Sequence, residues 1–171
     1  MGRDRDDELL LGEWACLGIL YQGPTHGFAI AARLKPDGDV GRVWSLSRPL
    51  TYRSLEQLTQ RGHARAVGEE RGIAGGNRTI LAATRQGRAR FRTWVATPVA
   101  HLRDLRSQLL LKLVLAEQCG IDVGPMLDRQ RSVIASISTA LAEGGDDDVV
   151  TRWRRESSEA ARRFVDAVRA S

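Results

Sequence analysis

The stretch SRPLTYRSLEQLTQRG, residues 47–62, decides the fold. Ser47 and Pro49 are typical of a helix start, and Gly62 is typical of a helix end. Leu55 and Leu58 lie three residues apart and predict one buried face. The rest of the helix surface carries mainly hydrogen-bond donors: Arg48, Thr51, Tyr52, Arg53, Gln57 and Arg61. A short helix with so many donors and so few carboxylates suits a negatively charged partner.

The basic surplus of the chain is concentrated around this helix. The 171 residues carry a net charge of +5, almost entirely through arginine. Residues 42–97 hold 11 basic and 3 acidic residues, whereas residues 98–171 hold 11 of each. A localised positive region indicates a polyanionic partner. A solvated surface without a partner would have the same composition, so the order of the elements must distinguish the two interpretations.

Two helices are expected before residue 47. Residues 9–21 form a long apolar run, which Gly23 and Pro24 end. Thr25 is expected to cap a second helix over residues 26–36. The inner face of that helix would hold Phe28, Ile30, Ala31 and Leu34. A turn follows, and residues 40–46 are predicted to form a short strand.

The period of the pattern changes after Gly62. Residues 63–70 alternate as an exposed strand does, and residues 77–84 predict a returning strand. Together they predict a hairpin with a glycine-rich tip between Arg71 and Arg78. Thr84 is expected to cap a fourth helix over residues 85–96, and helices follow to the end. An apolar stripe over residues 102–116 is broader than one packed neighbour needs, which favours a partner helix.

Three helices followed by a β-hairpin describe a winged helix-turn-helix. The predicted fold is therefore mostly α with a small β-hairpin. A winged helix-turn-helix DNA-binding domain would cover residues 1–97, and a helical dimerisation domain would cover residues 98–171. The third helix fits the major groove of DNA, which is about 12 Å wide. The hairpin would lie beside it, where its arginines reach phosphates or the minor groove.

Four segments, in order along the chain, resemble the PadR family of transcriptional regulators. Residues 9–34 resemble the opening helix pair of the family, including a His-Gly-aromatic turn at His26, Gly27 and Phe28. Residues 49–64 resemble its recognition helix. Residues 77–88 resemble its wing strand and the start of the next helix, and residues 103–120 resemble the first helix of its dimerisation region.

The resemblance implies a homodimeric repressor that binds a pseudo-palindromic operator and is released by a small molecule or another signal. The candidate DNA-binding residues lie on the third helix and the hairpin: Arg48, Thr51, Tyr52, Arg53, Gln57, Arg71, Asn77 and Arg78. Tyr52 would bind a phosphate, and Arg53 would bind a phosphate or a guanine edge. The alternatives are a Tyr52 ring packed in the core and hairpin residues in a solvated turn.

The tryptophans leave two interpretations open. Some relatives of the PadR family hold flat ligands between aromatic side chains near the dimer interface. Trp153 and Trp14 are the candidates for such an effector site in this chain. Alternatively, the tryptophans belong to the core, and Trp153 anchors the last helix on the first.

Nothing in the sequence predicts an enzyme. No segment supplies a nucleophile with a base, a metal cluster or a cofactor loop, and His26 is expected to make a turn hydrogen bond. Cys16 and Cys119 lie far apart in apolar surroundings, and the first residues lack the apolar region of a signal peptide, which predicts a cytoplasmic protein. The alternative function is a winged-helix module for protein contact or for nonspecific nucleic-acid binding.

Overall fold

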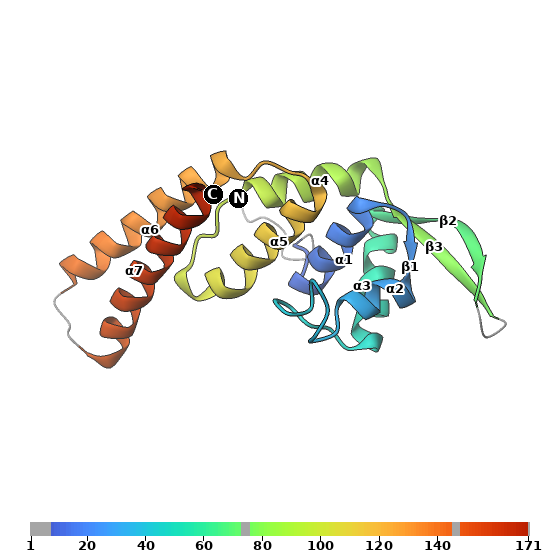
Figure 1. Ribbon diagram of the computed structural model, residues 1–171, viewed down its shortest axis with the longest axis horizontal. Helices are drawn as coiled ribbons and strands as arrows, with labels where there is room; N and C mark the ends of the chain where they lie inside the picture. The colour runs from blue at the N-terminus through green and yellow to red at the C-terminus, as the bar shows by residue number, and fades with distance from the viewer. Residues whose placement is uncertain (1–7, 73–75, 145–147, 171) are drawn as a thin grey trace.

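The structure is a computed structural model in which residues 8–72, 76–144 and 148–170 are described. Figure 1 shows an elongated molecule with a β-hairpin projecting at one end and a helical hairpin at the other. The elements are α1 (Leu11–Gln22), β1 (Thr25–His26), α2 (Gly27–Arg33), α3 (Arg48–Gln60), β2 (Ala64–Arg71), β3 (Asn77–Ala83), α4 (Arg85–Ala96), α5 (Leu110–Cys119), α6 (Gly124–Glu143) and α7 (Val149–Ala170). This order confirms the predicted fold class.

The ends of the predicted helices are set by local hydrogen bonds. The Ser47 hydroxyl accepts from the Leu50 amide at 3.4 Å and begins α3, and the Thr84 hydroxyl accepts from the Gly87 amide at 3.0 Å and begins α4. Gly62 follows α3 with a φ of 71°. Glycine adopts this left-handed conformation at little cost, so it ends the helix. These caps confirm the boundaries that the sequence predicts for the two helices.

The second helix starts one residue later than predicted. Its cap is His26, whose Nδ1 accepts from the Ala29 amide at 3.0 Å, as expected of a turn hydrogen bond. Thr25 does not cap the helix because it pairs with Leu81 in the sheet, while His26 pairs with Ile80. The sheet order is β1-β3-β2, and both pairings are antiparallel. The added strand ties the start of α2 to the hairpin.

The strand predicted over residues 40–46 is wrong. This segment forms turns, in which the Val43 amide donates to the Val40 carbonyl at 3.0 Å. It doubles back on the end of α2, where the Leu46 amide donates to the Leu34 carbonyl at 2.9 Å. A side chain at Gly41 would collide with the backbone of Lys35. The close approach explains why the apolar residues here pack as a loop instead of pairing in a sheet.

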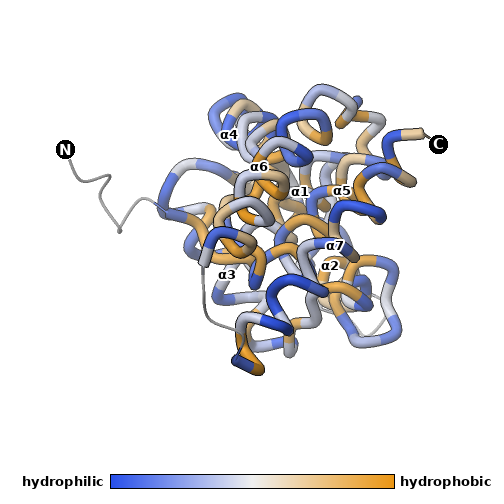
Figure 2. Tube along the Cα trace, turned by 90° about the vertical axis from the view of Figure 1, so that its left-hand side faces the viewer, coloured by the Kyte–Doolittle hydropathy of each residue, from blue (hydrophilic) through white to orange (hydrophobic). Residues whose placement is uncertain are grey.

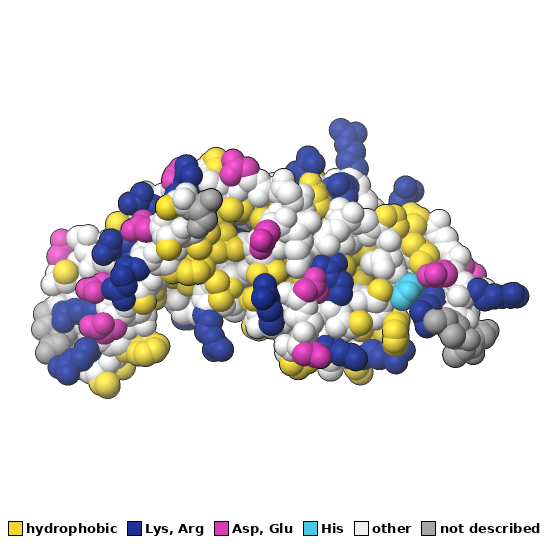
Figure 3. Space-filling view, in the orientation of Figure 1, with side chains coloured by type: hydrophobic (Ala, Val, Ile, Leu, Met, Phe, Trp, Pro, Cys, Tyr) yellow, Lys and Arg dark blue, Asp and Glu magenta, His cyan; other side chains and the backbone are white. Residues whose placement is uncertain are grey.

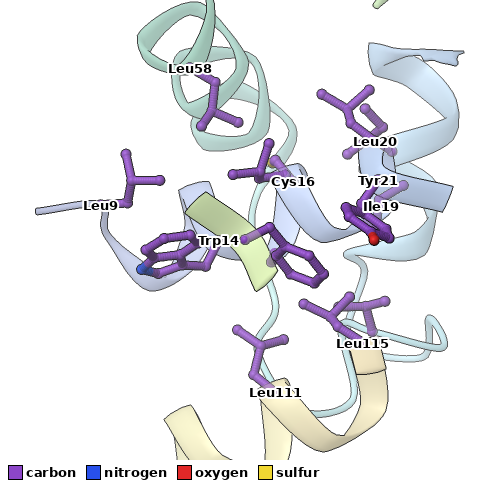
Figure 4. Close-up of a cluster of buried hydrophobic side chains, with 14 of the residues drawn as sticks. Leu9, Trp14, Cys16, Ile19, Leu20, Tyr21, Leu58, Leu111 and Leu115 are labelled. Carbon is purple, nitrogen blue, oxygen red and sulfur yellow. The ribbon is translucent and has the colours of Figure 1, made fainter. Parts of the chain in front are cut away.

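The main hydrophobic core surrounds α1, which is buried on nearly all sides. Trp14 stacks on Trp94 of α4 with ring centroids 4.7 Å apart. Figure 4 shows side chains of α1, Leu58 of α3, and Leu111 and Leu115 of α5 gathered in this core. Figure 2 shows hydrophobic and hydrophilic residues alternating along the helices. Cys16 is fully buried here, and burial raises the pKa of its thiol.

Helix α5 and the turns before it belong to two cores. Leu111 and Leu115 pack into the main core, whereas Leu105 and Leu109 pack with Ile134 of α6 in a second core. A 3₁₀ turn and a π-helical turn precede α5 over residues 102–109 and redirect the side chains. These two cores account for much of the breadth of the apolar stripe over residues 102–116. Leu110 and Val114 are half-buried and belong to neither core, so the partner helix stays a prediction.

Buried polar side chains hold the link between α4 and the C-terminal helices. The Lys112 ammonium donates to the Thr97 carbonyl at 2.5 Å and lies 5.0 Å from the centroid of the Trp94 ring. The Gln130 side chain accepts from the Val99 amide at 2.7 Å and donates to the Val99 carbonyl at 2.9 Å. Both side chains are buried. They fix the path of the chain from the winged helix into α5 and α6.

Lys112 gives the stability of the fold a specific pH dependence. Burial lowers the pKa of Lys112 to about 8 from the ordinary value of 10.5. Between these two pH values, Lys112 is protonated in the unfolded chain but not in the folded chain. The free energy of unfolding therefore rises with pH across this window, by about 1.4 kcal/mol for each unit by which the two pKa values differ. Urea denaturation at several pH values should show a rise in wild type that Lys112→Met lacks. Parallel curves for the two proteins would contradict a buried charge.

Candidate nucleic-acid interface

Helix α3 presents one buried face and one open face. Thr51, Leu55 and Leu58 form the buried face. Thr51 is 0% exposed, and its hydroxyl donates to the Ser47 carbonyl at 3.1 Å. The expectation that Thr51 lies on the open face is therefore wrong. The reason is helical phase, because residue 51 shares a face with residues 55 and 58.

The open face of α3 carries Tyr52 and Arg53, as predicted. Tyr52 is 44% exposed, so its ring is not packed in the core. Glu56 and Gln60 are exposed on the same side of α3. They were not selected from the sequence, although they lie three and seven residues after Arg53, which is the spacing of one helix face. The Gln60 amide donates to the Glu56 carboxylate at 3.2 Å. Guanidinium, amide and carboxylate groups are the ones that discriminate base edges in the major groove.

Two other polar side chains of α3 and its end, Gln57 and Arg61, have different surroundings. Gln57 is partly exposed, and its amide donates to Gln60 at 3.4 Å. Arg61 leaves the open face and lies 3.5 Å from the carboxylate of Glu13, which is almost completely buried. This ion pair ties the end of α3 to the start of α1. Gln57 thus stays available at the edge of the open face, while Arg61 has a structural role.

The β2–β3 hairpin supplies the wing. Arg71 at the end of β2 is exposed and pairs in register with Asn77 at the start of β3. The Asn77 amide donates to the Glu69 carboxylate at 2.9 Å. Arg78 is partly buried and turns toward α3. Residues 73–75 of the predicted glycine-rich tip lie outside the described residues.

A groove of about 690 Å³ separates the wing from α3. Its lining comes from the turn before α2, from α3 and from β3, and includes Phe28, Arg48, Tyr52, Gln60 and Arg78. Phe28 is 46% exposed, so its expected place on the inner face of the second helix is wrong. Its position on the first turn of α2 points it into the groove, while Ile30 and Leu34 fill the core.

Positive charge is left uncompensated on this face. Within the described residues, no carboxylate forms an ion pair with Arg48, Arg53 or Arg71. Figure 3 shows basic side chains along the edge below α3 and on the wing. Glu69 and Glu70 are consecutive in β2 and point to opposite faces of the hairpin. The Glu69 carboxylate accepts from Asn77, Glu70 lies 3.7 Å from His26, and Glu56 also lines the groove. The uncompensated positive charge on this face therefore comes from Arg48, Arg53 and Arg71.

The two candidate tryptophans are not brought together in the chain. Trp14 is only 7% exposed and stacks on Trp94. Trp153 on α7 is 72% exposed, so it does not anchor the last helix on the first. Trp153 lies on the helical hairpin at the end of the molecule away from the wing (Figure 1). Of the two, only Trp153 is open to a ligand or to another protein.

Across the described ranges, the structure brings no group of three or more His, Cys, Asp and Glu side chains into position for a metal ion. Among the same residues, none of the helices combines the length and the apolar character needed to cross a bilayer.

Helices α1 to α3 with the three-stranded sheet define a winged helix-turn-helix protein. No family model and no curated protein sequence matches the chain. The crystal structure of Bacillus subtilis PadR in complex with operator DNA is similar to it, with 14% sequence identity and a TM-score of 0.48, over 92% of this chain and 97% of that chain. The crystal structure of Bacillus subtilis PadR has 14% identity and a TM-score of 0.44, over 99% and 97%. Both are structures of a PadR protein, and the sequence motifs resemble that family.

Proposed function

We propose that the chain is a sequence-specific DNA-binding transcriptional regulator that acts in the cytoplasm as a homodimeric repressor on an inverted-repeat operator. The observation that carries this proposal is the open face of α3, where Tyr52 and Arg53 stand exposed. Tyr52 lines the groove beside the wing, and no carboxylate among the described residues is paired to Arg53. Residues 1–97 would bind DNA, and residues 98–171 would hold the dimer together.

The proposed mechanism divides the contacts by chemistry. Helix α3 enters the major groove, where Arg53, Glu56, Gln57 and Gln60 face base edges and set the sequence preference. Tyr52 and the arginines at the edges of α3 and the wing bind phosphates, and Asn77 lies among them at the wing. Phosphate contacts contribute affinity and fix the register, while base contacts choose the site.

Helix α7 supplies the support for a dimer. Its inner side, including Ser158 and Val165, is buried against the rest of the chain. A second row of side chains repeats every three and four residues along its outer side: Val150, Trp153, Ser157, Ala160, Phe164 and Ala167. In this row, called the α7 seam, Trp153 is 72% and Phe164 is 39% exposed. Such spacing is typical of helices that pair with another helix, and Figure 3 shows exposed hydrophobic side chains over α7.

The same seam is the proposed point of control. A flat small molecule that stacks on Trp153 would compete with the packing of two α7 helices. It could release DNA only by favouring a dimer geometry in which the two α3 helices no longer match the operator spacing. Trp14 is buried in the main core, so we place the effector at Trp153 and not between the two tryptophans.

Salt dependence tests the phosphate contacts directly. A dimer that uses its exposed arginines on phosphates should lose affinity by about 10³- to 10⁵-fold when salt rises from about 50 to about 200 mM. Fluorescence anisotropy with a labelled operator duplex measures this, with excess unrelated DNA as competitor. A flat salt response would contradict arginine–phosphate contacts. Complete displacement by unrelated DNA would favour the nonspecific binding module instead.

A further inference from the structure

Phe28 is an exposed aromatic side chain that neither the core nor the proposed base contacts explain. It is 46% exposed and lines the groove between α3 and the wing. What distinguishes it from an ordinary exposed apolar residue is its contact with two guanidinium groups, those of Arg48 and Arg78.

Phe28 is the central member of a stack of alternating rings and guanidinium groups. The Arg48 guanidinium carbon lies 5.3 Å from the centroid of the Phe28 ring and 5.8 Å from that of Tyr52. The Arg78 guanidinium carbon lies 4.9 Å from the centroid of the Phe28 ring. The stack therefore joins α3, the first turn of α2 and strand β3. We call these four side chains the arginine–aromatic stack.

The turn that carries Phe28 contacts strand β3 on one side and helix α3 on the other. His26 pairs with Ile80 in the sheet and caps α2. A Cβ atom at Gly27 would lie 2.8 Å from Cε1 of Tyr52, so the absence of a side chain there lets the Tyr52 ring lie against the turn. The turn before α2 thus has its position set by both the wing and α3.

We propose that Phe28 is a positioning residue that holds Arg48 and Arg78 at a fixed separation for phosphate binding; this rests on the proposed DNA-binding function. A guanidinium group stacked on a ring is attracted to the negative face of the ring while its N–H donors stay free at its edges. Holding two long side chains in place before binding removes part of the entropy cost of binding. Phe28 therefore links the phosphate contacts of the wing to those of α3.

The stack itself is tested in the free protein. Replacing Phe28 by Leu keeps an apolar side chain and removes the ring. NMR spectra of the Arg48 and Arg78 side-chain N–H groups should shift toward ordinary solvent-exposed positions in Phe28→Leu, while Arg103 on the exposed turn before α5 serves as the control and should not move. Unchanged Arg48 and Arg78 signals would overturn the stack, whatever the protein binds.

The positioning role is tested by binding to a labelled mixed-sequence duplex of about 30 base pairs, close to three turns of B-DNA. Phe28→Leu should weaken binding by about five- to thirtyfold for each protomer that contacts the duplex, the most that two exposed cation–π contacts can contribute by keeping both guanidinium groups ordered before binding. Phe28→Tyr should bind as wild type does. In a protein that also carries Arg48→Ala and Arg78→Ala, Phe28→Leu should have no further effect.

Each other outcome contradicts the proposal in a defined way. Wild-type affinity for Phe28→Leu would show that the ring has no role in binding. An equal loss with and without Arg48 and Arg78 would show that Phe28 contacts DNA itself. A third outcome is that the arginine signals shift in Phe28→Leu but the wild-type protein binds no duplex. The stack would then exist in the wild-type protein, and the DNA-binding function would be refuted. Thermal denaturation of every variant checks that it is folded.

Discussion

Replacing Tyr52 or Arg53 by alanine is expected to abolish operator binding while leaving a folded dimer. Both side chains stand on the open face of α3, so their removal leaves the core intact. A good contact to a base edge, as proposed for Arg53, is worth about 1–3 kcal/mol. A hydrogen bond from the Tyr52 hydroxyl to a charged phosphate is worth about 1.5–3 kcal/mol, and a two-fold dimer loses either contact twice. The expected loss is therefore about 2–6 kcal/mol, or roughly 30-fold to more than 10⁴-fold in affinity.

Gel-shift titration measures this loss with an operator duplex obtained by selection from random DNA, and sedimentation checks that the variant is still a dimer. Arg103→Ala is the matched control, because Arg103 is exposed and belongs to the second half of the chain, and it should bind as wild type does. Tyr52→Phe keeps the ring and removes only the hydroxyl, which separates phosphate bonding from packing. Wild-type binding by both alanine variants would place the recognition surface elsewhere.

Charge placed in the α7 seam is expected to separate the dimer. A variant with Trp153→Glu and Phe164→Glu puts two carboxylates where exposed rings now lie, and neither side chain is buried in the chain itself. The protein should then sediment as a monomer of 18.9 kDa. Loss of simultaneous binding to two half-sites should weaken operator binding by about 10²- to 10⁴-fold.

Thr139→Glu is the control for this variant, because Thr139 is exposed on α6 and gains one carboxylate outside the seam. It should remain dimeric and bind operator normally. A seam variant that stays dimeric would show that the two copies pair through another surface. A monomer with full affinity for the operator would show that dimerisation does not contribute to binding.

The elements with strong local signals could be predicted from the sequence. Ser47 and Thr84 cap their helices as expected, and Gly62 ends α3, because caps and left-handed glycines depend on neighbouring residues only. Strand β1 has two residues and gives no period to detect. The segment over residues 40–46 has the apolar content of a strand. It forms turns instead, because of its contacts with the end of α2.

The candidate site was predicted less completely, for two physical reasons. A short helix leaves its phase uncertain by one residue, which placed Thr51 on the open face and left Glu56 and Gln60 unnoticed. Aromatic residues are ordinarily assigned to the core, which misplaced Phe28 and kept a core position open as an alternative for Trp153. Exposure of a large ring depends on tertiary packing, and no local pattern reports it.

Selection of bound sequences from random DNA with the purified 171-residue protein asks whether the chain recognises a two-fold site. We expect enrichment of an inverted repeat whose half-site centres lie about 34–36 Å apart, one turn of B-DNA, as a two-fold pair of α3 helices requires. Failure to enrich any sequence, or enrichment of a single unrepeated site, would contradict the proposed homodimeric DNA-binding function.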